Sequence, residues 1–399
     1  MPGDAMTKRS GPTSTPVSQD AAPAIGLGSL PLLWPLHVAG AMSQSGAAVM
    51  KWYAQMLTGA SQDRAILPEP QWTTPNRIRL ELPSMHLREF STGSDGIPAL
   101  VCAPYALHGA TIADFGSGHS IVEALLKTGV SRIALTDWRS CAPEMRYFSI
   151  DTYLADLNVA VDALEPPVDL IGLCQGGWMA LVYAARFPNK VRRLVLAGAP
   201  VDIRAAPSKV SRMSEELPLA AFESLVQVGG GRVLGDHAVK LWGTNASTHD
   251  PNAVMQLAAG SDDARQAEMK QRFAAWDAWT LDLPGTYYLE VVRYLFKENR
   301  IAEGTFPALG EIADLSKVRA PLYLLAGADD DVAPPEQVFA AAGLVATPGA
   351  LIERQTVPCG HLSLFLGRET ISQAWVNAAR WLMRAEENVQ QGRHSEPRD

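Results

Sequence analysis

A cysteine occupies the middle of a Gly-x-Cys-x-Gly pattern at residues 172–176. The apolar run 168–173 follows two prolines and predicts a buried parallel strand, and residues 178–185 predict an apolar helix. Gly172 and Gly176 suit a turn so tight that larger side chains beside the cysteine would collide. A strand, a sharp turn and a helix in this order match the nucleophile elbow, in which a thiol here replaces the usual serine hydroxyl. The pattern therefore predicts a nucleophile at Cys174.

Further strands and helices alternate along the rest of the chain. Strands are expected at residues 99–104, 133–138, 191–200, 321–327 and 351–357, and helices at 150–164 and 371–384. Such alternation indicates a doubly wound, mostly parallel α/β sheet with right-handed crossovers. Together with the cysteine elbow, it predicts the α/β-hydrolase fold.

A carboxylate should follow the elbow, because the partners of its nucleophile come in the order acid and then histidine. Asp330 lies just past the predicted strand 321–327, where it can reach a histidine at the active-site edge of the sheet. Its position two residues before Val332 fits the usual G-x-x-D-x-V spacing. Asp329 and Asp331 are expected to be solvated or to cap the next helix.

His361 is the predicted base, because it follows the last predicted strand and completes the order nucleophile, acid, histidine. The other histidines lack this order, and most should be surface or structural residues: His37, His86, His108, His119, His237, His249 and His394. His108 and His119 stay as candidates, because they flank a loop that should border the site.

These three residues predict acyl transfer through a thioester. His361 would take the thiol proton or hold the pair as thiolate and imidazolium, while Asp330 fixes the histidine tautomer. The competing interpretation of Cys174 is a buried structural thiol, since free cysteine is among the most buried residue types.

The developing oxyanion needs two preorganised hydrogen-bond donors. One is expected from the backbone N–H of Gln175, the residue after the nucleophile. The other should come from the loop after the strand at 99–104, where Tyr105 and Ala106 are the candidates.

The net charge and the cysteine content limit which partners and which cellular compartment are expected. The net charge of −8 argues against nucleic acid as the main partner. Four scattered cysteines without ligand-like spacing predict a reducing compartment, no disulfide framework and no metal site. A chain of 399 residues can hold one large core and an insertion.

The chain divides into six predicted segments. Residues 1–23 are polar and predict a disordered tail rather than a signal peptide, and residues 387–399 predict a polar tail. Residues 24–75 predict an N-terminal helical region that packs on the core or offers a weak docking surface. Prolines and polar residues within it argue against a membrane span. The α/β-hydrolase core is expected at 76–205 and 320–386.

A helical cap is expected between the two parts of the core, at residues 206–319, because this segment is too long for a loop. Its aromatic residues suit an apolar or polymeric acyl substrate, or else simply form the core of the cap: Trp242, Trp276, Trp279, Tyr287, Tyr288, Tyr294 and Phe296.

From about residue 98 to residue 382, the chain resembles the polyhydroxyalkanoate synthases and the related intracellular polyhydroxyalkanoate depolymerases. Residues 172–177 look like the cysteine lipase box of the synthases, especially of the shorter two-subunit class. The resemblance continues at residues 137–139, 151–153, 199–202, 282–285, 299 and 314–321. Residues 287–290 and 360–368, and the chain length, look more like the depolymerase branch, whereas the Gly176-Gly177 pair favours the synthase branch.

Carried over residue by residue, the nucleophile, acid and base of the family fall on Cys174, Asp330 and His361. The resemblance implies a cytoplasmic enzyme at storage granules that forms an acyl-cysteine from (R)-3-hydroxyacyl-CoA and transfers the acyl group to a polyester chain. CoA would be a substrate or leaving group, and no cofactor is implied. A homodimer or a second subunit is implied as a partner.

Two alternatives remain open. A polyhydroxyalkanoate depolymerase, or another ester or thioester hydrolase, would use the same three residues and transfer the acyl group to water. A non-catalytic, granule-associated protein would use the apolar N-terminal region as a docking surface.

Overall fold

The computed structural model describes residues 69–242, 250–257 and 263–384, all of which fall within one compact unit. The predictions for the tails at 1–23 and 387–399, and for residues 24–68, lie outside these ranges. The boundaries proposed between core and cap stay predictions.

An eight-stranded sheet forms the centre of the described part. Its spatial order is β1 (Arg77–Glu81), β2 (Met85–Glu89), β6 (Ile133–Trp138), β3 (Ala99–Cys102), β7 (Val168–Leu173), β8 (Val191–Ala197), β13 (Leu322–Gly327) and β14 (Ile352–Val357). β2 pairs antiparallel with β1 and β6, whereas β6, β3, β7, β8, β13 and β14 pair in parallel. This arrangement confirms the predicted doubly wound, mostly parallel α/β sheet.

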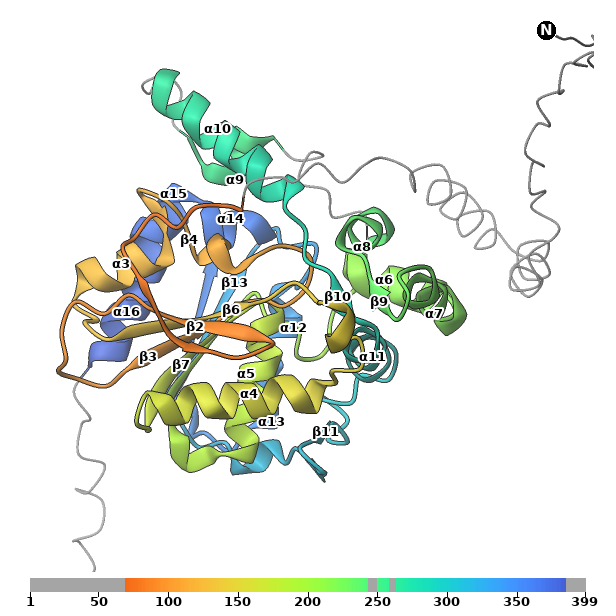
Figure 1. The fold of residues 1–399 in the computed structure, drawn as a ribbon. Helices are drawn as coiled ribbons and strands as arrows, with labels where there is room; N and C mark the ends of the chain where they lie inside the picture. Colours follow the sequence, from red (N-terminus) through yellow and green to blue (C-terminus); the bar gives the residue numbers. More distant parts are fainter. Residues whose placement is uncertain (1–68, 243–249, 258–262, 385–399) are drawn as a thin grey trace, which may run out of the picture. The chain divides into compact units, whose positions relative to one another are not determined.

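The central strands are short apolar runs because helices cover both of their faces. Every residue of β3, β6, β7 and β13 is buried. Helices α3 (Ile121–Thr128) and α16 (Val376–Met383) pack together on one face, and α4 (Ile150–Ala163) and α5 (Gln175–Arg186) pack together on the other (Figure 1). Because these strands run parallel, their carboxyl ends lie at one edge of the sheet, where the following loops can bring functional side chains together.

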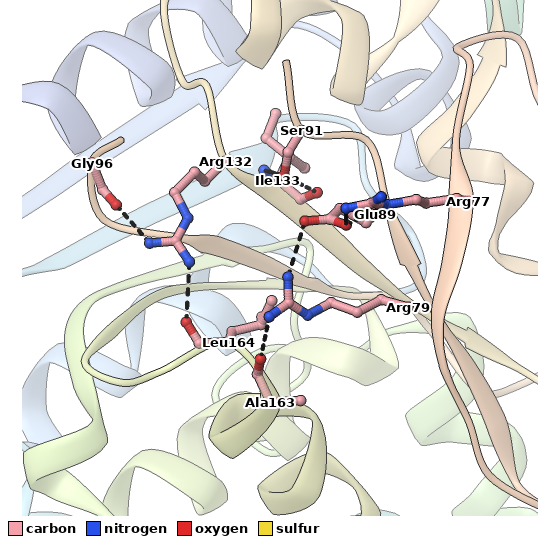
Figure 2. A network of polar contacts seen from close by, with 9 residues as sticks. All are labelled: Arg77, Arg79, Glu89, Ser91, Gly96, Arg132, Ile133, Ala163 and Leu164. Atoms are coloured by element: carbon pink, nitrogen blue, oxygen red, sulfur yellow. Dashed lines mark hydrogen bonds and ion pairs between the residues drawn. The ribbon is translucent and has the colours of Figure 1, made fainter. Parts of the chain in front are cut away.

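The strand pair β1–β2 was not predicted from the sequence, because its alternating charged residues resemble a solvated loop. One of those charges, on Arg79, connects the pair to the end of α4 in a polar network (Figure 2). Arg79 forms an ion pair of 3.1 Å with Glu89 and donates to the carbonyl oxygen of Ala163 at 2.7 Å. Arg132 donates to the carbonyl oxygen of Leu164 at 3.4 Å. The last carbonyls of the helix thus gain partners that the helix itself cannot supply.

A mainly helical insertion lies between β8 and β13. It contains α6 (Lys209–Glu216), α7 (Leu219–Val228), α8 (Gly235–Trp242), α9 (Pro251–Met255), α10 (Asp263–Ala278), α11 (Gly285–Glu290) and a π-helical segment, Val291–Lys297. The two short strands β9 (Arg232–Val233) and β10 (Leu283–Pro284) pair in this region, as do β11 (Pro307–Ala308) and β12 (Glu311–Ile312).

Shorter elements complete the described chain. They are β4 (Asp114–Gly116), β5 (His119–Ser120), α12 (Pro335–Phe339), α13 (Ala341–Leu344), α14 (His361–Leu366), α15 (Arg368–Thr370) and a π-helical segment, Ile371–Trp375. Among the residues that the structure describes, no helix combines the length and the apolar character needed to cross a membrane.

The prediction of an N-terminal helical region is wrong for its last residues. Residues 69–75 are described and form neither helix nor strand. Pro70 and Pro75 disfavour a helix there. The backbone N–H groups of Thr73 and Thr74 instead donate to the carboxylate of Asp114, at 2.9 and 2.7 Å.

Candidate active site

Cys174 lies in the sharp turn between β7 and α5, with φ 48° and ψ −117°. Residues other than glycine rarely adopt this backbone conformation, and they do so where the surrounding structure enforces it. Glycines make the turn feasible: a Cβ atom at Gly172 would lie 2.4 Å from the Cα of Gly177, and one at Gly176 would lie 2.1 Å from the carbonyl oxygen of Cys102. The predicted elbow is therefore present, and the first turn of α5 packs closely against the end of β3.

Replacing Gly176 with alanine should reduce the free energy of unfolding by about 3 kcal/mol, because the added methyl group meets backbone that cannot move cheaply. Urea unfolding measures this loss. Gly343→Ala is the matched control, since a Cβ atom there meets nothing within 4 Å, and it should change stability by no more than about 1 kcal/mol. Equal midpoints for Gly176→Ala and the wild type would contradict the close approach of β3 and α5.

Three side chains from distant segments meet at the carboxyl edge of the sheet. The Nε2 atom of His361, at the start of α14, lies 3.2 Å from the Sγ atom of Cys174. Its Nδ1 atom lies 2.7 Å from Oδ2 of Asp330, which follows β13. The structure thus brings the predicted nucleophile, base and acid into one hydrogen-bonded chain, the geometry that nucleophilic catalysis requires.

The structure also distinguishes Asp330 from its two neighbours. The Asp330 side chain is fully buried, and its Oδ1 atom accepts the backbone N–H groups of Val332 at 2.9 Å and Ala333 at 2.8 Å. These bonds hold Oδ2 toward the histidine. Asp329 and Asp331 are exposed, as predicted, but neither caps the next helix, because α12 begins after Pro334 without a side-chain cap.

The pKa of His361 is raised well above its usual value. Burial alone would lower this pKa, but the negative charges of Asp330 and of the Cys174 thiolate, together with their hydrogen bonds, outweigh burial. The site therefore favours the imidazolium form of His361.

The predicted oxyanion donors lie around the same space. Gln175 is the first residue of α5, so its backbone N–H has no acceptor within the helix. Tyr105 and Ala106 follow β3, and within the described ranges no acceptor is found for either backbone N–H. The Tyr105 side chain turns inward, where its hydroxyl lies 3.2 Å from the carbonyl oxygen of Arg139. Any donation to an oxyanion from Tyr105 would therefore come from its backbone.

A cavity of about 440 Å³ opens onto these groups, and its lining is mostly apolar. Cys174, Gln175 and His361 line it at the carboxyl edge of the sheet, and Tyr105 and Ala106 line it from the loop after β3. Of the aromatic residues singled out in the sequence, Trp242, Trp276, Tyr287, Tyr288 and Phe296 line the cavity, whereas Trp279 and Tyr294 do not. The insertion therefore supplies much of the wall, and a drug-sized acyl group fits its volume.

The two additional histidine candidates differ in position. His108 lines the cavity, with its ring 4.4 Å from that of Trp276, and burial lowers its pKa despite the nearby charge of Asp277. His119 lies outside the cavity lining and its Nδ1 atom is 2.8 Å from the carbonyl oxygen of Leu366. Neither belongs to the hydrogen-bonded chain around Cys174.

One residue of this region was not predicted as part of the site. The sequence shows Tyr287 only as one of the aromatic residues of the insertion. In the structure, its hydroxyl donates to the carbonyl oxygen of Tyr105 at 3.2 Å. The contact joins residues separated by 182 positions, and no local pattern reports such a pair. In the described ranges, no group of three or more His, Cys, Asp or Glu side chains is placed to bind a metal ion.

Comparisons with known proteins agree with this fold. The model of the alpha/beta hydrolase fold family matches residues 107–368. The chain is 23% identical to the poly(3-hydroxyalkanoate) polymerase subunit PhaC of Haloferax mediterranei, over 81% of this chain and 67% of that protein. It is 27% identical to the subunit of the same name from a Synechocystis species, over 71% of this chain and 75% of that protein.

Among solved structures, the monoacylglycerol lipase of Paleococcus ferrophilus is similar, with a TM-score of 0.50 and 17% identity. The match covers 75% of this chain and 98% of the lipase. At this identity the likeness concerns the fold alone. The PhaC subunits, in contrast, are distant relatives over most of the chain.

Proposed function

The chain belongs to the alpha/beta hydrolase fold family, and from this premise we propose that it is a polyhydroxyalkanoate synthase-like acyltransferase with Cys174 as its nucleophile. The observation that carries the proposal is the chain of contacts from Cys174 through His361 to Asp330. The activity named for the distant relatives, the PhaC polymerase subunits, suggests the substrate class, a 3-hydroxyacyl group. The donor would be (R)-3-hydroxyacyl-CoA and the acceptor the end of a polyester chain.

In the first half-reaction, the thiolate of Cys174 attacks the thioester carbonyl carbon, and the carbonyl electrons move to oxygen. The oxyanion accepts the N–H of Gln175 and a second N–H from the loop after β3. The bond from carbon to the CoA sulfur then breaks, and His361 gives its proton to the leaving thiolate. The products are free CoA and an acyl group held on Cys174 as a thioester.

In the second half-reaction, the hydroxyl group of the acceptor gives its proton to His361 while its oxygen attacks the acyl carbon. The ester bond forms, the acyl–sulfur bond breaks, and the thiolate–imidazolium pair returns. Acylation removes the negative charge of Cys174, one of the causes that raise the pKa of His361. The histidine is thus a stronger acid after acylation, and its neutral form, which this step needs, becomes more accessible.

A second candidate function is hydrolysis of a polyester or another ester with the same residues. The charges at the cavity favour it: in the described part of the lining, Lys209 is the sole lysine or arginine, and Asp329 and Asp331 are acidic. Several phosphate charges of CoA would meet few cations there, whereas a neutral ester would need none. A polyhydroxyalkanoate chain is such a neutral ester.

Incubating the purified full-length protein with (R)-3-hydroxybutyryl-CoA tests the proposal. Thiol release reports on acylation, and the size of the acyl product reports on the acceptor. We expect CoA release together with oligomeric or polymeric ester. Free 3-hydroxybutyrate, or turnover of preformed amorphous polyester alone, would replace synthesis by hydrolysis. Turnover of neither substrate would contradict both functions.

A further inference from the structure

We infer that Tyr287, on α11 of the insertion, is a positioning residue that fixes the oxyanion loop and makes the backbone N–H of Ala106 its donor. The inference rests on the proposed function, because it concerns the oxyanion of that acyl transfer. It assigns a part of the catalytic arrangement to the insertion rather than to the sheet.

The hydrogen bond from Tyr287 acts on one defined peptide unit. The hydroxyl of Tyr287 donates to the carbonyl oxygen of Tyr105 at 3.2 Å. That carbonyl and the N–H of Ala106 belong to the same planar trans peptide unit, so the two groups point in opposite directions. Holding the carbonyl toward Tyr287 therefore holds the N–H of Ala106 away from it.

The N–H that is oriented in this way is available to a ligand. Ala106 lines the cavity that also contains Cys174, and its N–H has no acceptor in the part of the chain that the structure describes. The N–H of Tyr105 belongs to the preceding peptide unit, on which the Tyr287 hydroxyl does not act. Of the two residues that the sequence left open, Ala106 is the one whose donor direction is fixed.

The phenol of Tyr287 is itself held rigidly. Its side chain is 1% exposed, and its ring lies 5.2 Å from the ring of Tyr105 and 4.9 Å from that of Tyr153. Burial is the main cause that raises the pKa of Tyr287 well above its usual value, and the charges of nearby ionisable groups raise it further. The hydroxyl thus keeps its proton throughout the working pH range. A weaker alternative acceptor, the Sδ atom of Met179, lies 3.8 Å from the hydroxyl.

Neighbouring contacts hold the rest of the loop but leave this peptide unit to Tyr287. On one side, the N–H of Ala103 donates to the hydroxyl of Thr136 at 3.0 Å. On the other, the N–H of Leu281 donates to the carbonyl oxygen of Leu107 at 2.9 Å. The peptide unit between Tyr105 and Ala106 lies between these two anchors. Without the Tyr287 hydroxyl it could rotate while the loop stays in place.

The test compares Tyr287→Phe with Tyr183→Phe. Tyr183 is also buried and its hydroxyl also makes a hydrogen bond, to Asn158 at 3.1 Å, but it does not line the cavity. Tyr287→Phe should lower kcat for acyl transfer by about 100-fold with little change in KM, because an oxyanion donor acts in the transition state. Tyr183→Phe should retain wild-type kcat, and both variants should have similar Tm values.

A spectroscopic measurement separates positioning from a general loss of structure. Acylation with p-nitrophenyl butyrate carrying a ¹³C carbonyl would label Cys174 independently of CoA, and infrared difference spectra would give the stretching frequency of the thioester carbonyl. Loss of an oxyanion donor should raise this frequency in Tyr287→Phe and leave it unchanged in Tyr183→Phe.

The outcomes distinguish the two levels of inference. An unchanged frequency and kcat in Tyr287→Phe would overturn the role of Tyr287 and leave the acyltransferase proposal standing. A wild type that is acylated by the nitrophenyl ester but not by hydroxybutyryl-CoA or polyester would overturn the proposed substrate class alone. A wild type in which neither reagent acylates Cys174 would overturn both proposals.

Discussion

Replacing Cys174 with alanine should abolish formation of an acyl-enzyme and lower turnover by at least about 10⁴-fold, because the acyl group then has no atom to attach to. His361 and Asp330 remain, yet neither can form the thioester. Intact-protein mass spectrometry after addition of (R)-3-hydroxybutyryl-CoA measures the acyl group directly, and thiol release measures turnover. Undiminished turnover in Cys174→Ala would exclude the thioester mechanism.

Cys141→Ala provides a matched control for this loss. The Cys141 thiol is buried and lies outside the lining of the cavity, 3.2 Å from the carbonyl oxygen of Ala142. Burial raises the pKa of Cys141 and that of Cys102 to about 12 each, and the pKa of Cys359 to about 11. These three thiols stay protonated near neutral pH and should resist acylation. Cys141→Ala should therefore acylate at the wild-type rate.

Cys174→Ser separates the need for a nucleophile from the need for a thiolate. The histidine would have to deprotonate an alcohol, which is much harder to ionise than a thiol. We expect weak ester hydrolysis at best. Full activity of Cys174→Ser would count against a thiolate requirement while keeping the remaining geometry.

The elements that the sequence predicted share a strong local signal. The central strands appear as short apolar runs because both of their faces are buried, and the elbow is visible because two glycines flank Cys174 within five residues. Spacing alone also singled out Asp330 among three adjacent aspartates. The structure adds the reason: Asp330 is buried, with one carboxylate oxygen held by the backbone and the other by His361.

The features that the sequence did not predict depend on contacts between distant segments. β1 and β2 carry several charges, and their partners lie on the neighbouring strand, on β6 and, for Arg79, at the end of α4, about 80 residues later. The choice of Ala106 over Tyr105 that we infer could not be made from the loop, because the hydroxyl that bonds to this peptide unit belongs to Tyr287. His108 and His119 are close in sequence, but only the fold shows that His108 reaches the cavity.

Replacing His361 with glutamine should slow acyl transfer by about 10³- to 10⁴-fold, because an amide can neither take up nor release the proton that both half-reactions move. The buried carboxylate of Asp330 would also lose its cationic partner. His86→Gln is the control, since His86 lies on β2 and outside the cavity lining, and it should retain activity. Stopped-flow thiol release and product analysis would separate acylation from transfer.

The role of His361 also predicts how the rates of the two half-reactions change with pH. Acylation needs the imidazolium form of His361 to protonate the leaving thiolate, so its rate should fall as the pH rises through the raised pKa of this histidine. Transfer needs the neutral form, so its rate should fall as the pH drops below the pKa that His361 has in the acyl-enzyme. That second pKa should be the lower of the two, because acylation removes the thiolate charge. His361→Gln should show neither limb, and a wild-type acylation rate that increases through the alkaline range would contradict the thiolate–imidazolium pair.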